Sequence, residues 1–548
     1  MNDLLPEKKL FPNGPLSFIS KQRDSFKIPM LGLGSEWSCL FFWLAFSSIL
    51  IGHLVIIWSV HVFPFVDLPD HLATATILRY FGATGTQFDK YYSIGSLMGK
   101  PNVLHYMFCS SSLFPSVEVA NRVYYSIYAI LLPVSVLLVI RKCGGERWNA
   151  LLSFLLMYNL SACWGFAGFT LSIPVLFVFF YVVIQYVDRS SFYFEVAIAL
   201  LFIAFFLLHA LMTVFALSLY AVLVMYCFAK PDKKRFVRSI VPMLPVVTIV
   251  LFWWNSREIS SGAGIGFFSS LITYYSQHYV ETFIERSRLV VFDNYFLFPG
   301  MLGYATAGLF FVVIVIPVVL WGIKAPYRAS AAGLPNEKSV KCVLLLSGWS
   351  LFCFLSLPGE IFNFQVLYQR FSVVFLLSVI VVGGSLSSTK SYRTVKFITC
   401  AACVMHLVLW SHYFASFDEA NRCFNKDFFP KDSEQKTLGG LIYDLKFRGK
   451  PVYVHFPSYY IVWTHGVATF RIVDLIDFAP PLRRKLNGNP IPEYQEWAWL
   501  STELGHTYAK LDYLLVRGAV PSASEHALLD HRLLNRCGEW RLYKVIGK

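Results

Sequence analysis

Long apolar runs separated by short polar segments dominate the chain between residues 39 and 413. Several of these runs approach the ~20 apolar residues that one bilayer crossing needs. The pattern predicts a polytopic α-helical membrane protein with about 11 transmembrane helices. The expected spans are, in chain order, about 39–62, 123–140, 148–163, 166–187, two short spans within 192–228, then 237–254, 302–321, one ending near 357, 371–382 and 397–413.

One apolar run, from Phe192 to Phe228, is too long for a single crossing and contains His209 at its middle. We therefore expect two short spans that meet at an outer turn formed by His209 and Ala210. Ionisable groups inside long apolar runs are rare and are often functional. Solvation at the turn explains His209 in one reading, and substrate binding explains it in the other.

The basic residues follow the topology that these spans imply. Lys and Arg gather in the 1–38 tail and in every second loop, which the positive-inside rule places in the cytoplasm. The long loops at 63–121 and 255–301, and the tail 414–548, then lie outside. The formal charge of +14 would indicate nucleic acid in a soluble protein. Here topology explains much of it, so membrane lipids are expected partners and nucleic acid is not.

The tail from residue 414 to residue 548 has a different composition, with more charge, Pro and Gly and no spanning run. The short runs PVYVHF, YLLVRG and WRLYKVI read as strands, and Ser501–Lys510 and Ser522–Leu534 read as helices. We expect a small external α/β domain. Cys423 and Cys537 are candidates for a disulfide there, because external compartments permit one; two unpaired buried thiols are the alternative.

The first external loop carries the most unusual polar cluster, within the sequence FPFVDLPDHLATATILRYF. Asp67, Asp70 and His71 lie within five positions, directly after the first span. Asp67 is placed to cap a short helix with Asp70 three residues on, so helix capping competes with catalysis as an explanation. Leu72, Ala75 and later apolar residues at the same spacing predict that this helix lies along the membrane surface.

The order of these parts resembles the GT-C superfold of membrane glycosyltransferases, which includes the protein O-mannosyltransferases and the aminoarabinose transferase of lipid A. The resemblance covers the whole chain in outline and rests, at residue level, on DLPDH and on the outer Arg of YQRF. It implies a sugar donor linked to polyprenyl phosphate and an acidic residue in the first external loop that acts as base or metal ligand. The family often has adjacent acids, whereas Asp67 and Asp70 are separated by two residues.

Sugar transfer from a lipid phosphate needs a base for the acceptor hydroxyl and cations for the departing phosphate. We expect Asp70 to be the base and Asp67 its orienting or metal-sharing partner. Arg370 is the first candidate for the phosphate, because Arg binds phosphate bidentately; an interfacial Arg that reaches water is the alternative. Glu360 is its candidate ion-pair partner.

A divalent cation, Mg²⁺ or Mn²⁺, is a further candidate, with Asp67, Asp70 and His71 as its ligands. A hydrogen-bonded His71 without a metal is the alternative.

The sequence therefore indicates an integral membrane glycosyltransferase that acts at the outer face of the membrane on a glycan, lipid or protein acceptor. A bacterial inner membrane, with the N-terminus in the cytoplasm, is the expected location. A transporter or flippase would show internal repeats and mid-membrane charges. A non-catalytic membrane scaffold would keep the architecture without the chemistry.

Overall fold

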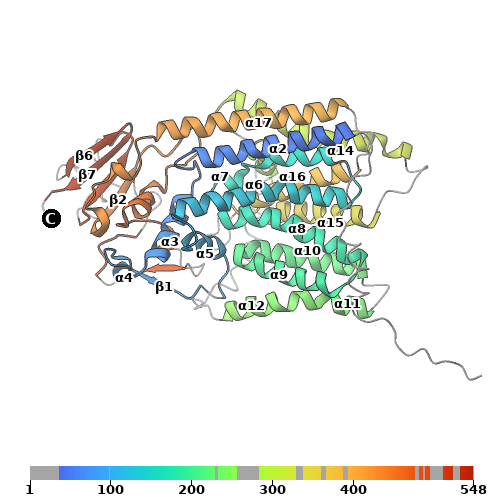
Figure 1. Ribbon diagram of the computed structural model, residues 1–548, viewed down its shortest axis with the longest axis horizontal. Helices are drawn as coiled ribbons and strands as arrows, with labels where there is room; N and C mark the ends of the chain where they lie inside the picture. Colours follow the sequence, from blue (N-terminus) through green and yellow to red (C-terminus); the bar gives the residue numbers. More distant parts are fainter. Residues whose placement is uncertain are drawn as a thin grey trace, which may run out of the picture. The chain divides into compact units, whose positions relative to one another are not determined.

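The computed structural model describes residues 36–97, 99–228, 233–255, 283–295, 297–328, 337–359, 366–386, 393–474, 481–485, 488–493, 510–521 and 531–546 (Figure 1). The chain divides into two compact units, Met1–Ser47 and Ser48–Lys548. The described part of the first unit is the beginning of helix α2 (Glu36–Ser59). The contacts of the tail and of the first external loop are all within the second unit.

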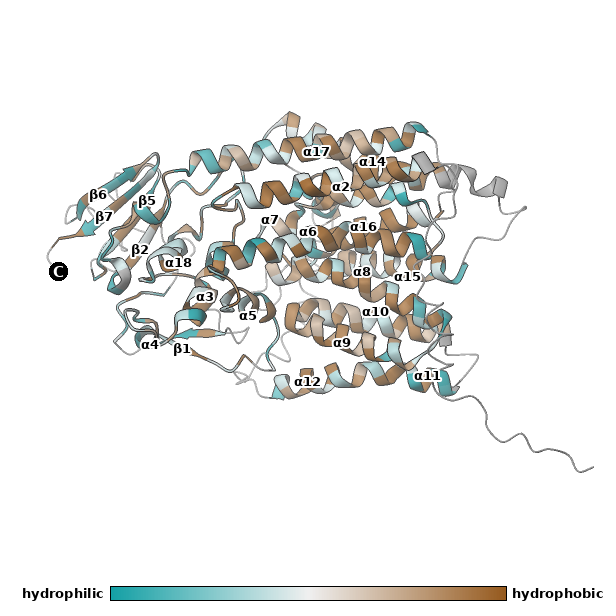
Figure 2. Ribbon diagram, viewed as in Figure 1, coloured by the Kyte–Doolittle hydropathy of each residue, from teal (hydrophilic) through white to brown (hydrophobic). Residues whose placement is uncertain are grey.

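The described residues include nine helices that are long and apolar enough to cross a membrane. Figure 2 shows their apolar colouring, for example along α6 and α16. This confirms the predicted fold class of a polytopic helical membrane protein. The helices that form these spans are α2, α6 (Val117–Lys142), α8 (Ala167–Asp188), α10 (Ala210–Phe228), α11 (Lys233–Ile240) with α12 (Leu244–Asn255), α14 (Met301–Arg328), α15 (Glu337–Ser356), α16 (Gln369–Leu386) and α17 (Arg393–Ala420).

Two of the expected spans have another form. Helix α9 (Phe192–Leu208) is apolar but shorter than the nine. The expected α-helical span at 148–163 is wrong, because a 3₁₀ helix, η2 (Arg147–Leu156), and the short helix α7 (Leu160–Cys163) replace it. Residues 149–159 are buried throughout, and η2 packs against α6, α16 and α17. This segment therefore faces protein on all sides instead of lipid.

The break predicted at His209 is present. Helix α9 ends at Leu208, His209 has an extended backbone, and α10 begins at Ala210. The Asn102 side chain of the first external loop accepts a hydrogen bond from the Ala210 N–H at 2.8 Å. A loop residue thus satisfies one of the N–H groups that the start of a helix leaves without a partner.

The first external loop folds into short elements: α3 (Leu68–Tyr80), α4 (Phe88–Tyr91), β1 (Tyr92–Ile94) and α5 (Leu104–Ser110). Leu72 and Ala75 of the predicted apolar stripe are buried. Helix α3 packs against helix α18 (Tyr459–Thr464) of the tail, so this face of the helix is covered by protein.

The tail contains a five-stranded sheet in the order β3-β2-β5-β7-β6. Strand β2 (Thr437–Ile442) is parallel to β3 (Val467–Ala468) and β5 (Tyr513–Arg517), while β7 (Trp540–Val545) is antiparallel to β5 and β6 (His531–Cys537). A separate two-stranded sheet pairs β4 (Leu482–Arg484) of the tail with β1 of the first external loop. A disulfide joins Cys423 to Cys537, which confirms the bonded alternative over that of two unpaired thiols.

The strands predicted from YLLVRG and WRLYKVI are confirmed as β5 and β7. The strand predicted from PVYVHF is wrong: residues 452–455 form turns, with Val452 and Tyr453 buried. The helix predicted at 522–534 is wrong at His531–Leu534, which belong to β6; residues 522–530, like 501–509 of the other predicted helix, lie outside the described residues.

Candidate active site

The DLPDH stretch is held by the turn that follows α7. The N–H of Val66 donates to the Cys163 carbonyl at 3.1 Å, and the N–H of Asp67 donates to the Trp164 carbonyl at 2.9 Å. Gly165 adopts a φ of +81°, and a Cβ atom there would lie 2.8 Å from the Leu68 nitrogen. The turn therefore approaches the main chain of Asp67 as closely as only glycine permits.

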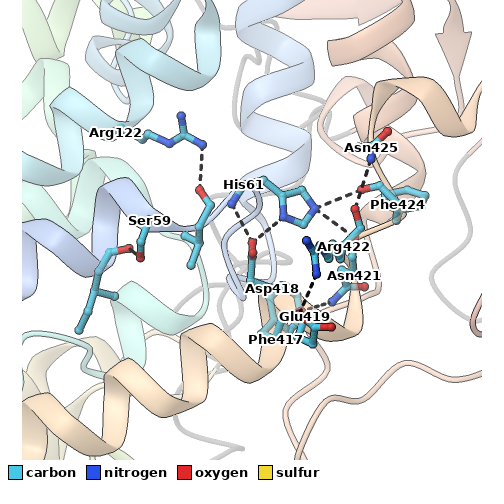
Figure 3. Close-up of polar contacts among 12 residues, drawn as sticks. Ser59, His61, Arg122, Phe417, Asp418, Glu419, Asn421, Arg422, Phe424 and Asn425 are labelled. Carbon is cyan, nitrogen blue, oxygen red and sulfur yellow. Dashed lines mark hydrogen bonds and ion pairs between the residues drawn. The ribbon is translucent and has the colours of Figure 1, made fainter.

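His61, six residues before Asp67, fastens the same loop to the end of α17 (Figure 3). Its Nδ1 lies 2.5 Å from Asp418 Oδ1, and its backbone N–H donates to the same oxygen at 2.8 Å. Its Nε2 lies 3.1 Å from the Asn421 carbonyl oxygen and 3.3 Å from that of Phe424. The chain entering the site is thus tied to the chain that leads into the tail.

Asp67 precedes α3 at the N-cap position, but its carboxylate makes no capping hydrogen bond. It lies instead 3.5 Å from His455 Nε2, and its side chain is 29% exposed. Burial tends to raise the pKa of Asp67, but nearby basic side chains, His455 foremost, hold it below its ordinary value of 3.8. This carboxylate is therefore ionised at neutral pH.

Asp70 has a different environment, since it is only 1% exposed and contacts the tail through both oxygens. Oδ1 accepts a hydrogen bond from the Ser458 hydroxyl at 2.5 Å, and Oδ2 accepts one from the Arg471 N–H at 3.0 Å. Burial raises the pKa of Asp70, and the opposing effects of His455 and Ser458 do not cancel this rise. The side chain holds the tail against α3.

His455 joins the two acids. Its Nδ1 lies 3.4 Å from Asp70 Oδ2, on the opposite side of the ring from the contact with Asp67, and the side chain is 3% exposed. Burial tends to lower the pKa of His455, but the two carboxylates raise it above 6.5. His455 is not recognisable from the sequence, because its partners lie 385 residues or more away and its own segment, PVYVHF, is an apolar run without Asp, Glu, Lys or Arg.

His71 points to a different partner, the Tyr106 hydroxyl, which lies 2.8 Å from Nδ1. Burial lowers the pKa of His71 to about 4, so the ring is neutral at pH 7. The expected metal set of Asp67, Asp70 and His71 does not fit an ion well, because both oxygens of Asp70 and one nitrogen of His71 have other partners. Among the described residues, no group of three or more His, Cys, Asp or Glu side chains is arranged to hold a metal ion.

Arg370 and His209, two residues proposed to bind substrate, lie in direct contact. Arg370 Nη1 donates to His209 Nε2 at 2.9 Å, and its Nε donates to the Val366 carbonyl at 3.0 Å. The guanidinium lies 3.8 Å from the centre of the Phe166 ring, in the turn that also holds Asp67. His209 is buried, so solvation at the turn, one of the two readings of this residue, does not account for it.

All the predicted site residues that the structure describes therefore lie near one another. The charge of Arg370 lowers the pKa of His71, and that of Asp67 raises it, so the three groups share one electrostatic neighbourhood. Residues from the first loop, the α9–α10 turn and the start of α16 meet there. Glu360, the proposed partner of Arg370, lies outside the described residues.

Comparisons with known proteins add little to this geometry. No protein-family model matches the chain, and no curated protein matches it. Among solved structures it is similar to ArnT from Cupriavidus metallidurans in the apo state, with 11% sequence identity and a TM-score of 0.44 over 93% of this chain and 98% of that chain.

Proposed function

We propose that this protein is a membrane glycosyltransferase that transfers a sugar from a polyprenyl-phosphate donor to an acceptor hydroxyl at the outer face of the membrane. The observation that carries the proposal is that an ionised, partly exposed carboxylate and a buried guanidinium lie at the same turn. Asp67 and Arg370 are held by the same 163–166 turn, through its main chain and through the Phe166 ring. A base and a phosphate-binding cation are the two groups that the reaction needs.

The geometry favours Asp67 over Asp70 as the base. Asp67 is ionised and partly exposed, whereas Asp70 is enclosed and engaged by the tail. Asp70 then acts as a positioning residue, since it holds the His455 ring that contacts Asp67. This exchanges the roles that the sequence suggested for the two acids.

The bond changes follow from these positions. Asp67 accepts the proton of the acceptor hydroxyl as the acceptor oxygen bonds to the anomeric carbon of the sugar. The bond between that carbon and the phosphate oxygen breaks, and its electron pair leaves with the phosphate. Arg370 stabilises the charge that develops on the phosphate, and attack from the opposite face inverts the anomeric configuration.

The test is transfer of labelled sugar by the purified chain from a panel of polyprenyl-phosphate sugars. We expect Asp67→Asn to lower the rate by about 10²-fold or more, the usual loss on removal of a general base. Asp89→Asn is the matched control, because it makes the same change at an exposed acid of the same loop. Equal rates for Asp67→Asn and the unsubstituted chain would refute this role for Asp67. Absence of transfer from every donor would favour transport or scaffolding.

A further inference from the structure

A tight turn of the tail, Phe447–Lys450, reaches back to the membrane helices. The N–H of Phe447 donates to the Lys450 carbonyl at 2.9 Å, and the N–H of Lys450 donates to the Phe447 carbonyl at 3.0 Å. The two central residues have positive φ, +46° for Arg448 and +85° for Gly449. This is the pattern of a type I′ turn, in which Arg is an unfavourable residue.

Arg448 fixes this turn against α17. Its Nη2 donates to Ser416 Oγ at 3.1 Å and lies 3.5 Å from His412 Nε2. Its guanidinium also lies 5.5 Å from the centre of the Phe298 ring. These contacts hold the turn in which Lys450 is the last residue.

Lys450 extends toward aromatic rings and a thiol. Its Nζ lies 4.7 Å from the Trp410 ring centre, 5.4 Å from that of Tyr413, and 3.4 Å from Cys163 Sγ. The Cys163 thiol donates its proton to the Tyr158 carbonyl at 3.2 Å, so the sulfur facing Lys450 is uncharged. Across the described part of the chain, no carboxylate lies within ion-pair distance of Lys450. The two rings stabilise the ammonium by cation–π contact, and its positive charge is left for an anion to neutralise.

The position of Lys450 relates it to the candidate active site. Cys163 begins the 163–166 turn, and its carbonyl accepts the hydrogen bond from Val66, the residue before Asp67. Phe166 at the other end of the turn carries the Arg370 guanidinium on its ring. Two cations from distant segments thus lie at the two ends of one turn, and the main chain of Asp67 is bonded between them.

We propose that Lys450 binds the phosphate of a membrane lipid, as a second cation besides Arg370. The ammonium supplies a compact charge with three donors, which suits a phosphate oxygen. Trp410 and Tyr413 are buried side chains of the membrane-spanning helix α17, and they hold the ammonium beside the end of that span that leads into the tail. The identification of the lipid as an isoprenoid phosphate rests on the proposed function; the phosphate site itself rests on the contacts of Lys450.

The experiment measures binding of a labelled polyprenyl monophosphate to the full chain in nanodiscs, with polyprenyl alcohol and phosphatidic acid as competitors. We expect Lys450→Met to weaken monophosphate binding by about tenfold or more, as the loss of a charge-assisted contact implies. Lys450→Arg should retain most of the affinity. Lys446→Met is the matched control, because it removes the same charge from an exposed position just before the turn.

The outcomes separate this inference from the proposed function. Equal affinity of Lys450→Met and the unsubstituted chain would overturn the inference even if sugar transfer is observed. Loss of affinity in both Lys450→Met and Lys450→Arg, with lowered melting temperatures, would also overturn it, since it would indicate a role in folding. Binding that depends on Lys450 and is competed equally by phosphatidic acid would support the phosphate site and would count against an isoprenoid ligand.

Discussion

At the scale of single residues, the two acids of DLPDH show how environment separates groups with the same chemistry. Asp67 and Asp70 both contact His455, yet their pKa values move in opposite directions. Asp67 has one strong basic neighbour and some contact with water, whereas Asp70 is enclosed. Pairs of acids with divergent pKa values are characteristic of sites that carry out proton transfer.

The raised pKa of His455 predicts a pH-dependent stability. Because the folded value lies above the ordinary 6.5, the imidazolium stabilises the fold fully below that pH, and this contribution is lost as the pH rises through the folded pKa. Asp67 has a lowered pKa, so its contribution is lost only as the pH falls through a value below 3.8, well away from this window.

We therefore expect His455→Gln to lower the free energy of unfolding most near pH 6, by about 3–5 kcal/mol for loss of one partner of a buried pair. The difference from the unsubstituted chain should shrink as the pH rises through the folded pKa of His455. Thermal unfolding followed by tryptophan fluorescence measures it. In an Asp70→Asn background the pH dependence should be smaller, and a constant difference at every pH would contradict the assignment.

At the scale of elements, the 163–166 turn organises the site more than any helix does. It supplies the two carbonyls that bind the N–H groups of Val66 and Asp67, and the ring beneath Arg370. Gly165 permits this turn through both its positive φ and the closeness of Leu68.

Gly165→Ala tests this role, with Gly300→Ala as the control. Both glycines have a φ of +81°, so both substitutions carry a similar backbone cost of about 1–2 kcal/mol. Only at position 165 would the new Cβ press on the main chain, at 2.8 Å from the Leu68 nitrogen and 3.0 Å from that of Asp67. We expect sugar transfer to fall by about 10²-fold in Gly165→Ala alone, the usual effect of misplacing a reacting group. Equal activity of the two variants would remove the turn from the mechanism.

At the scale of the whole molecule, the tail contributes residues to the candidate site. His455, Ser458 and Arg471 contact the acids of the first loop, β4 pairs with β1, and His61 bonds to the end of α17. The Cys423–Cys537 disulfide ties the segment after α17 to the edge strand β6. Stability of the tail and geometry of the site are therefore coupled.

Removal of this disulfide should lower the stability of the chain. The bond closes a loop with a sequence separation of 114 residues, and loss of a structural disulfide typically costs about 2–5 kcal/mol. We expect the Cys423→Ser/Cys537→Ser variant to unfold at a lower temperature than a Cys353→Ser/Cys400→Ser control, which changes two half-buried free cysteines. Identical melting curves would contradict a stabilising bond. Labelling of both thiols in the unsubstituted chain would contradict the bond itself.

The sequence by itself determined the features that depend on local pattern. Apolar runs of spanning length predicted most of the membrane helices and the break at His209, because burial in lipid selects composition over ~20 successive residues. The β5 and β7 strands were also predicted, because short runs rich in Val, Tyr and Leu between turn residues are a local signal. DLPDH was recognisable because acids at the end of a span are unusual.

Only the tertiary structure decided which groups meet. The 3₁₀ form of Arg147–Leu156 and the turns in PVYVHF arise where the chain is enclosed by protein, and an apolar pattern alone does not distinguish that setting from lipid or from a sheet. The partners of Asp70 lie up to 401 residues away in sequence, and Lys450 reaches Cys163 over 287. Contacts at such separations, and the burial that moves the two aspartate pKa values apart, follow from how the tail closes on the first loop, which no single stretch of sequence records.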